Sequence, residues 1–399
     1  MMEIRPVAPP EIDRLSSRAL YVGIAALAAC AIWAVFNAEQ FFRSYLLAYV
    51  FWIGVALGCL AILMVQHMSG GAWGLVIRRV LEAATRTFLP MALLFIPLAV
   101  GLKFIYVWAN PGAAAGNEEL AHLLEHKEPY LNVPFFLIRV VFYFAVWIGV
   151  TYFLNKWSLE QDQTGDRRIT RKMQILSGPG LVLYGLTVTF ASIDWVMSLE
   201  PEWFSTIYGI LFMGGQGVLA MAFVISVLIL LRNHKPFSEI IAPRHFHDLG
   251  KLLLAFIMLW AYFNFSQFLI IWSGNLPEEI PWYLRRLQGP FKWIGLIIVI
   301  FHFALPFLML LSRDLKRSGR RLAMVAVAVI VLRLVDLYWL IAPEFHHGEF
   351  HPHLMDIIAP VGLGGIWVWF FCRQLKTRPL LPVGDPELEG AIGPGEGHH

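Results

Sequence analysis

YLLAYVFWIGVALGCLAILMVQ, residues 45–66, is a run of 22 residues without a charged side chain. A helix rises about 1.5 Å per residue, so about 20 apolar residues cross the roughly 30 Å hydrocarbon core of a bilayer. The stretch therefore predicts a transmembrane helix.

Nine further runs of comparable length and polarity lie on either side of this one. The ten predicted spans are roughly residues 20–36, 45–66, 88–108, 133–154, 178–199, 207–231, 249–272, 291–311, 322–342 and 354–372. The chain of 399 residues is 58% apolar and 15% charged, whereas about a quarter of the residues in a soluble domain are charged. These features predict an all-α membrane protein with ten transmembrane helices.

The basic residues are distributed unevenly between alternate loops. Residues 5–18, 78–86, 156–172, 232–244, 313–321 and 373–378 contain 22 of the 31 Lys and Arg residues, and the opposite loops contain only four. Loops rich in Lys and Arg stay in the cytoplasm, so we expect both termini there. Basic loops of this kind complement anionic lipids and do not indicate nucleic acid binding.

The opposite loops are acidic and contain two stretches that predict surface helices. Asn117 is placed to cap EELAHLLEHK, and the other stretch is PEEIPWYLRRLQ, residues 277–288. We expect Trp282 and Tyr283 of the second stretch at the depth of the lipid headgroups. Both chain ends are rich in Pro, Gly and charge, which predicts extended or disordered tails.

A weak internal repeat relates spans two to five to spans six to nine. Asp194 is followed seven residues later by Pro201-Glu202, and Asp336 is followed seven residues later by Pro343-Glu344. The repeat predicts two four-helix bundles flanked by single helices. The resulting units are a tail at 1–19, a helix at 20–44, bundles at 45–206 and 207–353, a helix at 354–376 and a tail at 377–399.

Ionisable side chains inside the predicted spans are the candidate functional residues. Each costs about 3 kcal/mol on insertion scales, so such residues usually face protein or water. Lys103, Arg139 and Asp194 lie at one depth on spans three, four and five, so we expect opposite charges to meet there. A proton path is one interpretation, and its candidate residues are Asp194, Lys103, Arg139, Tyr184, Thr187, Asp336, Arg333 and His302.

Other interpretations of the same groups stay open. Buried ion pairs also fix helix packing without any transport or catalysis. A quinone headgroup could bind at Asn264, Gln267 and Trp195. Weaker alternatives are a haem held by His302 and His67, and a metal held at the outer surface by His346, His347, His351 and His353 with Glu344 and Glu349. We do not expect a metal, because the histidine spacing matches no defined site.

Three motifs carry a resemblance to a known family. They are SIDWVMSLEPEWFST at residues 192–206, YGILFMGGQG at 208–217 and WYLRRL at 282–287. With the ten-helix layout, the chain resembles the NrfD/PsrC-like quinone-interacting membrane subunits. It resembles most closely the ActF subunits of bacterial alternative complex III, a respiratory quinol:cytochrome c oxidoreductase of the inner membrane.

The resemblance implies an electron-transport complex and a supporting role in it. The implied partners are the related quinone-binding subunit ActC, an iron–sulfur subunit, multihaem and monohaem cytochromes c, and in some complexes a terminal oxidase. Menaquinone or ubiquinone and lipid are the implied small molecules, with no covalently bound cofactor and no redox centre in the chain itself. The alternatives are a secondary transporter and a purely structural scaffold subunit.

Overall fold

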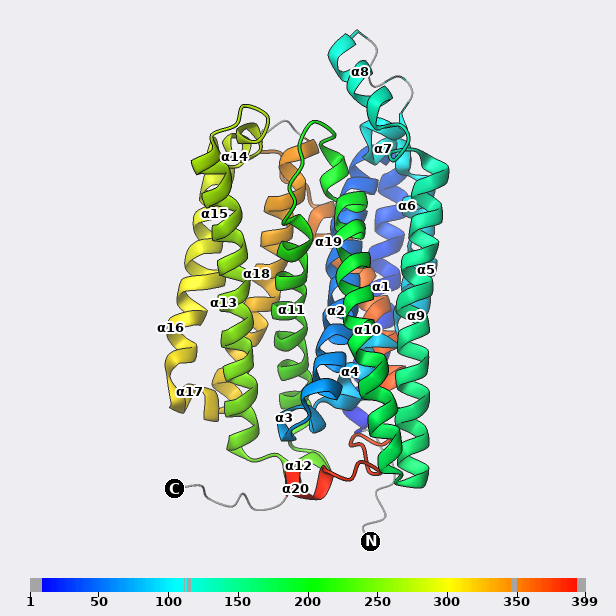
Figure 1. Cartoon of the computed structure of the whole chain (residues 1–399), viewed down its shortest axis with the longest axis vertical. Helices are drawn as coiled ribbons and strands as arrows, with labels where there is room; N and C mark the ends of the chain where they lie inside the picture. The colour runs from blue at the N-terminus through cyan, green and yellow to red at the C-terminus, as the bar shows by residue number, and fades with distance from the viewer. Residues whose placement is uncertain (1–8, 111, 113–115, 346–349, 393–399) are drawn as a thin grey trace.

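The computed structural model describes residues 9–110, 112, 116–345 and 350–392 (Figure 1). These residues form helices and no strand, and ten helical segments among them are long and apolar enough to cross a membrane. The segments are Pro10–Phe36 (α1), Ala38–Ser69 (α2), Arg78–Val100 (α4, α5 and α6), Val133–Thr164 (α9), Arg167–Leu199 (α10 with η2), Tyr208–Leu231 (α11), Pro243–Gly274 (α13), Phe291–Leu311 (α15, η3 and α16), Gly319–Phe345 (α18) and Met355–Leu375 (α19). The predicted fold class is confirmed.

The spans form two groups of four. In the first group α2 packs against α4 and α10, and α10 packs against α9. In the second group α11 packs against α13 and α18, and the span made of α15, η3 and α16 packs against these two helices. The groups meet where α2 and α10 pack against α11. The flanking helices α1 and α19 lie together, and α19 packs along α2 (Figure 1).

Polar residues cap the N-termini of three helices in the first group. The side chains of Asn37, Asn132 and Asp166 accept hydrogen bonds from backbone N–H groups in the first turns of α2, α9 and α10. Such caps satisfy donors that have no partner inside the helix. The third span is interrupted, with α4 at Arg78–Thr85, α5 at Phe88–Leu94, α6 at Ile96–Val100 and α7 at Leu102–Ile105.

Two faces of the molecule lie at opposite ends of the helices. We call the face with the ends of α1 and α19 near Pro10 and Leu375 the terminal face, and the opposite one the far face. Both predicted surface helices exist at the far face, as α8 (Glu118–Lys127) and α14 (Ile280–Leu287). The Asn117 side chain accepts from Leu120 N at 3.0 Å, as expected for a cap.

The structure corrects the two predicted tails. Helix α1 begins at Pro10, so residues 10–19 are helical and not part of a tail. Residues 377–392 fold against the terminal face and end in α20 (Leu388–Ile392), because their charges find buried partners there. Trp282 of α14 is buried within the protein, where its ring stacks on Trp203 with 4.8 Å between the centroids.

Candidate functional site

Asp194 is fully buried in the last turn of α10 and has two hydrogen-bonding partners on α9. Arg139 donates from Nε to Oδ2 and from Nη2 to Oδ1, each at 2.8 Å. The Tyr143 hydroxyl donates to Oδ2 at 2.6 Å. Two parallel bonds from one guanidinium are the strongest arrangement for a carboxylate. The expectation that Arg139 and Asp194 meet inside the bundle is therefore confirmed.

Aromatic faces and a carbonyl complete the environment of Arg139. Its Nη1 donates to the Tyr130 carbonyl at 3.0 Å, and its Cζ lies 3.9 Å from the centre of the Tyr130 ring and 4.4 Å from that of Phe135. A guanidinium is attracted to such ring faces. A cavity of about 400 Å³ at the far face is lined by Tyr130 and by Ser198, whose hydroxyl donates to the Asp194 carbonyl at 2.6 Å.

Lys103 does not join this cluster. It lies on the short helix α7, its side chain is exposed, and its Nζ is 4.9 Å from the Phe104 ring centre. Gly101 separates α6 from α7, so the third span does not continue as one regular helix to this level. The expectation that Lys103 faces Asp194 is wrong for this reason.

Tyr184 and Thr187 lie on α10 toward the middle of the membrane and are buried. Thr187 Oγ1 accepts from Trp147 Nε1 at 2.9 Å, and the Tyr184 hydroxyl contacts Gln216 Oε1 of α11 at 2.7 Å. Trp195 packs among aromatic rings and lines a cavity of only about 10 Å³. That cavity is too small for a quinone ring, so the structure does not support Trp195 as a quinone ligand.

The polar residues of α9 form a stripe that sequence reasoning missed. Thr151, Asn155, Ser158 and Asp162 follow Arg139, Tyr143 and Trp147 at steps of three or four residues, and all except Asp162 are buried. Steps of three and four keep side chains on one helix face. The stripe spans 24 residues, or about 35 Å of helix, which exceeds the roughly 30 Å hydrocarbon core of a bilayer.

At the terminal face the stripe meets a second buried carboxylate, Glu82 of α4. Ser158 Oγ donates to Glu82 Oε1 at 2.6 Å, and Arg79 Nη1 donates to Glu82 Oε2 at 2.6 Å. Arg79 also pairs with Asp162. The predicted spans placed residues 78–86 and 156–172 in loops, so these groups were not considered. The signal that could have found them is the spacing of polar residues beyond residue 154.

Asp336 is the centre of the second cluster, in α18. Arg333 pairs with it along the helix, as the spacing of three predicted, and Trp260 Nε1 donates to its Oδ2 at 3.2 Å. The Arg333 guanidinium lies against the backbone of α11, where a Cβ added at Gly215 would be 2.1 Å from its Cζ. Asp194 and Asp336 therefore both have an arginine partner, but the arginine comes from a neighbouring helix in one case and from the same helix in the other.

His302 lies in η3 (Ile298–Ala304), a π-helical turn in the eighth span. Its side chain is fully buried, and neither ring nitrogen has a hydrogen-bond partner among the described residues. Its ring meets the Trp260 ring edge-on, with 4.5 Å between centroids. π-Helical turns often occur at functional sites, and Trp260 links His302 to Asp336.

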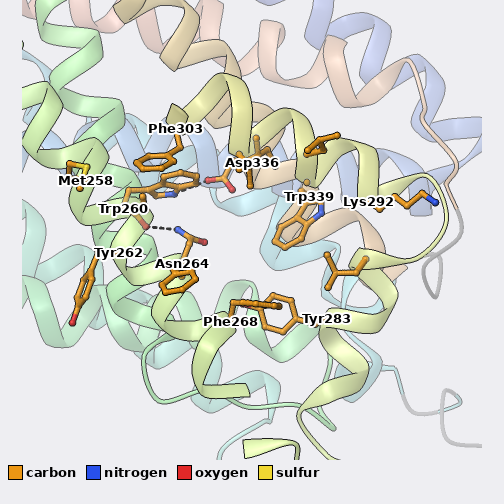
Figure 2. A pocket seen from close by; sticks show the side chains of 17 residues that line it. Met258, Trp260, Tyr262, Asn264, Phe268, Tyr283, Lys292, Phe303, Asp336 and Trp339 are labelled. Atoms are coloured by element: carbon orange, nitrogen blue, oxygen red, sulfur yellow. Dashed lines mark hydrogen bonds between the residues drawn. The ribbon is translucent and has the colours of Figure 1, made fainter. Parts of the chain in front are cut away.

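A pocket of about 700 Å³ lies beside Asp336, between α13, α14, α15, η3 and α18 (Figure 2). Its walls include Trp260, Phe268 and Trp339, with Asp336 and Asn264 as the polar groups near its inner wall. The Asn264 side chain donates to the Trp260 carbonyl at 2.8 Å (dashed in Figure 2). Pocket-lining side chains such as Tyr262, Phe265 and Val299 are more than half exposed on the membrane-facing surface, so the pocket opens toward lipid.

Gln267 is not among the pocket residues. Its Oε1 accepts from the Ser205 hydroxyl at 2.7 Å, which ties α13 to the segment after α10. Of the three residues considered for a quinone, the structure thus brings only Asn264 to a cavity of suitable size.

Charged residues of the far face join the two bundles. Arg285 of α14 pairs with Glu200 and lies 3.3 Å from Glu344 of α18, and Arg286 also pairs with Glu344. Burial raises the pKa of the Glu200 carboxyl to about 8, and the neighbouring Glu344 carboxylate adds to the rise. Two close carboxylates disfavour double ionisation, which favours the protonated form of Glu200.

The histidines considered for an outer metal are only partly described. His346, His347 and Glu349 lie outside the described residues. His353 Nδ1 accepts from Met355 N at 3.1 Å. Among the residues that the structure describes, no group of three or more His, Cys, Asp and Glu side chains could hold a metal ion.

These features define a multi-pass helical membrane protein with a buried Arg–Asp cluster in each half. No known family model matches the sequence, and no curated protein is similar to it.

Proposed function

We propose that this chain is a proton-handling, non-haem membrane subunit of a respiratory quinol:cytochrome c oxidoreductase of the alternative complex III type. In this proposal it lies in the bacterial inner membrane with both termini in the cytoplasm, which makes the far face periplasmic. The observation that carries the proposal is the stripe on α9, which leads from the Asp194–Arg139–Tyr143 cluster to Glu82.

The chemistry of the stripe favours proton transfer over packing alone. A packing contact needs one ion pair at one level, whereas this stripe has polar groups toward both ends of α9, with the Trp147 indole bonded to Thr187 between them. Tyr, Thr and Ser hydroxyls both donate and accept hydrogen bonds, as a chain for protons requires. The far-face cavity beside Tyr130 and Ser198 gives water an approach to the Asp194 end.

The motifs behind the family resemblance meet in space, which supports the proposed family. Glu200 and Trp203 belong to the segment 192–206, and they contact Arg285 and Trp282 of WYLRRL. The same segment carries Asp194. The motifs therefore form one structural unit that fixes the far-face end of the proposed path.

The experiment that tests the proposal is purification of the native assembly with this chain tagged. We expect haem and iron–sulfur absorbance to co-purify with quinol oxidation activity. In that complex Asp194→Asn should lower quinol turnover and proton release at least tenfold, whereas Asp248→Asn, an exposed carboxylate on α13, should leave both unchanged. An assembly without redox cofactors, with solute uptake by the isolated chain in liposomes, would favour a secondary transporter. Full activity of Asp194→Asn would favour a scaffold.

A second candidate role, binding of a quinone, rests on the pocket beside Asp336. A quinone needs an apolar, aromatic cavity reached from the membrane and polar groups for its ring oxygens. The pocket of about 700 Å³ opens toward lipid and offers the Asp336 carboxylate, the Asn264 amide and the Trp339 indole N–H, which has no partner in the described part of the chain. Menaquinone or ubiquinone would fit this chemistry.

A further inference from the structure

Residues 376–388 form a segment that we call the C-terminal strap, and it folds back over the terminal face of the first bundle. Leu380 and Leu381 are buried in the main hydrophobic core. Arg86, which directly follows α4, donates to the Gln374 carbonyl at 2.7 Å and to the Thr377 hydroxyl at 2.8 Å, where the strap leaves α19. The strap is therefore part of the packed structure.

The strap covers the end of the α9 stripe. Arg378 Nη1 donates to Glu82 Oε2 at 3.2 Å and to Asn155 Oδ1 at 3.1 Å. Glu82 is 1% exposed and Ser158 is 1% exposed. Asn155 and Ser158 are the last buried polar side chains of the stripe before Asp162, and the strap lies between them, with Glu82 beside them, and the terminal face.

Two further contacts seat the strap. Asp385 Oδ2 pairs with Arg78 Nη1 at 2.6 Å, and Gly384 N donates to Asp162 Oδ1 at 3.3 Å. The backbone approaches α9 closely at Gly384, because a Cβ there would lie 1.9 Å from the Gln161 carbonyl oxygen. Only glycine allows this approach.

The strap can move away from the terminal face without changing the net charge of the buried cluster that remains. Arg378 and Asp385 bring one positive and one negative charge. After their removal, Arg78 and Arg79 still face Glu82 and Asp162, so the remaining cluster stays neutral. What changes is Glu82, which loses one of its two cationic partners and becomes accessible to water, so that its carboxylate can exchange a proton with the terminal face.

We propose that the C-terminal strap is the terminal-face closure of the α9 stripe and that Glu82 is the carboxylate that exchanges protons with water when the strap opens. Arg378 acts as a positioning residue that pairs with Glu82 and keeps it covered. A proton from terminal-face water binds the Glu82 carboxylate on opening, and the Ser158 hydroxyl, which is hydrogen-bonded to Glu82 Oε1, is the first group of the stripe beside it. The closure stands on the contacts alone, and the role of Glu82 rests on the proposed proton function.

Closure is tested by the accessibility of a cysteine at the end of the stripe. Ser158→Cys is introduced into this chain, whose native cysteines Cys30, Cys59 and Cys372 are buried, and labelling of this chain by a membrane-impermeant maleimide is timed in the intact complex. Gly384→Ala should unseat the strap and raise the labelling rate at least tenfold. Gly390→Ala is the matched control, because a Cβ there meets nothing within 4 Å, and it should leave the rate unchanged. Equal rates in the two variants would overturn the closure.

A milder variant keeps this test independent of misfolding. Arg378→Gln removes the positive charge that pairs with Glu82 without a steric clash and should also raise the labelling rate, whereas Arg378→Lys keeps that charge and should label slowly. Slow labelling in both single variants, Arg378→Gln and Gly384→Ala, would overturn the proposal.

The role of Glu82 is tested by proton uptake in the same complex. Glu82→Gln should reduce proton uptake from the terminal-face side at least tenfold. If Asp194→Asn abolishes proton release while Glu82→Gln leaves uptake intact, the role of Glu82 is overturned and the proposed function stands. If neither variant has an effect, the proposed function itself fails, and the labelling result still decides whether the strap is a closure.

Discussion

The guanidinium of Arg139 holds the carboxylate of Asp194 through two parallel hydrogen bonds of 2.8 Å each, between α9 and α10. Because the partners come from different helices, this contact sets the register of α9 against α10 as well as the charge at that level. In the second bundle Arg333 and Asp336 share one helix, so their pairing fixes no register. The two clusters are therefore not equivalent in what they stabilise.

We predict that breaking the Arg139–Asp194 pair from either side lowers stability by about 3–5 kcal/mol, because one charge is left buried without its partner. Asp194→Asn and Arg139→Gln should each lower the midpoint of thermal unfolding in detergent. The double variant removes both charges and should recover much of the loss. Lys251→Gln is the control, since its pair with Asp248 is exposed and exposed pairs contribute about 0–1 kcal/mol. Additive losses in the double variant would contradict a specific pair.

The close approach of α2 and α11 gives a prediction about packing between the bundles. A Cβ at Gly58 would lie 2.1 Å from the Gln216 carbonyl oxygen, whereas a Cβ at Gly149 of α9 meets nothing within 4 Å. Gly58→Ala should therefore destabilise the protein by about 1–3 kcal/mol, the usual cost of overpacking, while Gly149→Ala should be neutral or slightly stabilising. Thermal unfolding of the two variants side by side measures this, and an equal response would show that α2 and α11 can separate freely.

The spans and the Asp194 partner could be predicted because both follow from composition and helix geometry. Long uncharged runs have one stable solution in a bilayer, and the depth of Arg139 and Asp194 follows from counting residues along each helix. The rotation of a helix about its axis is harder to predict. Counting residues places Lys103 at the same depth as Asp194. The third span, however, breaks near Gly101, and the Lys103 side chain faces outward.

The strap and the end of the α9 stripe could not be predicted by the same reasoning. Residues 377–388 are rich in Pro, Gly and charge, which is typical of a disordered tail. Their order depends on Arg378 and Asp385 finding Glu82 and Arg78, which are hundreds of residues away in the sequence. Such pairing is a property of the tertiary structure and leaves no local pattern. The polar half of α9 was missed because a hydropathy criterion ends the span where charged residues begin.

Glu200 predicts a pH dependence of stability. Its pKa is raised from about 4.5 to about 8 by burial, with the Glu344 carboxylate adding to the rise. The folded state thus binds the proton more tightly than the unfolded state, so this contribution is full below about pH 4.5 and is lost as the pH rises through about 8. Glu200→Gln should flatten the decline of unfolding temperature between pH 5 and pH 8. Parallel profiles for the variant and the natural protein would contradict a protonated Glu200.

The pocket beside Asp336 gives the last prediction, which concerns the second candidate role. If a quinone binds there, its ring oxygens need the donors and acceptors at the inner wall, and a buried polar group left without a partner costs about 1–3 kcal/mol. Trp339→Phe removes the indole N–H while keeping an aromatic wall, and Asn264→Leu removes the amide, so each should weaken binding of a short-chain quinone by about tenfold. Binding is measured by quenching of tryptophan fluorescence or by calorimetry on the purified complex, with any catalytic quinone site of a partner subunit blocked. Gln267→Leu is the matched control, because Gln267 lies on the same helix but faces Ser205 and not the pocket. If all three variants bind equally well, the pocket holds lipid chains only, and a quinone role for this chain is wrong while the proton path through the first bundle is unaffected.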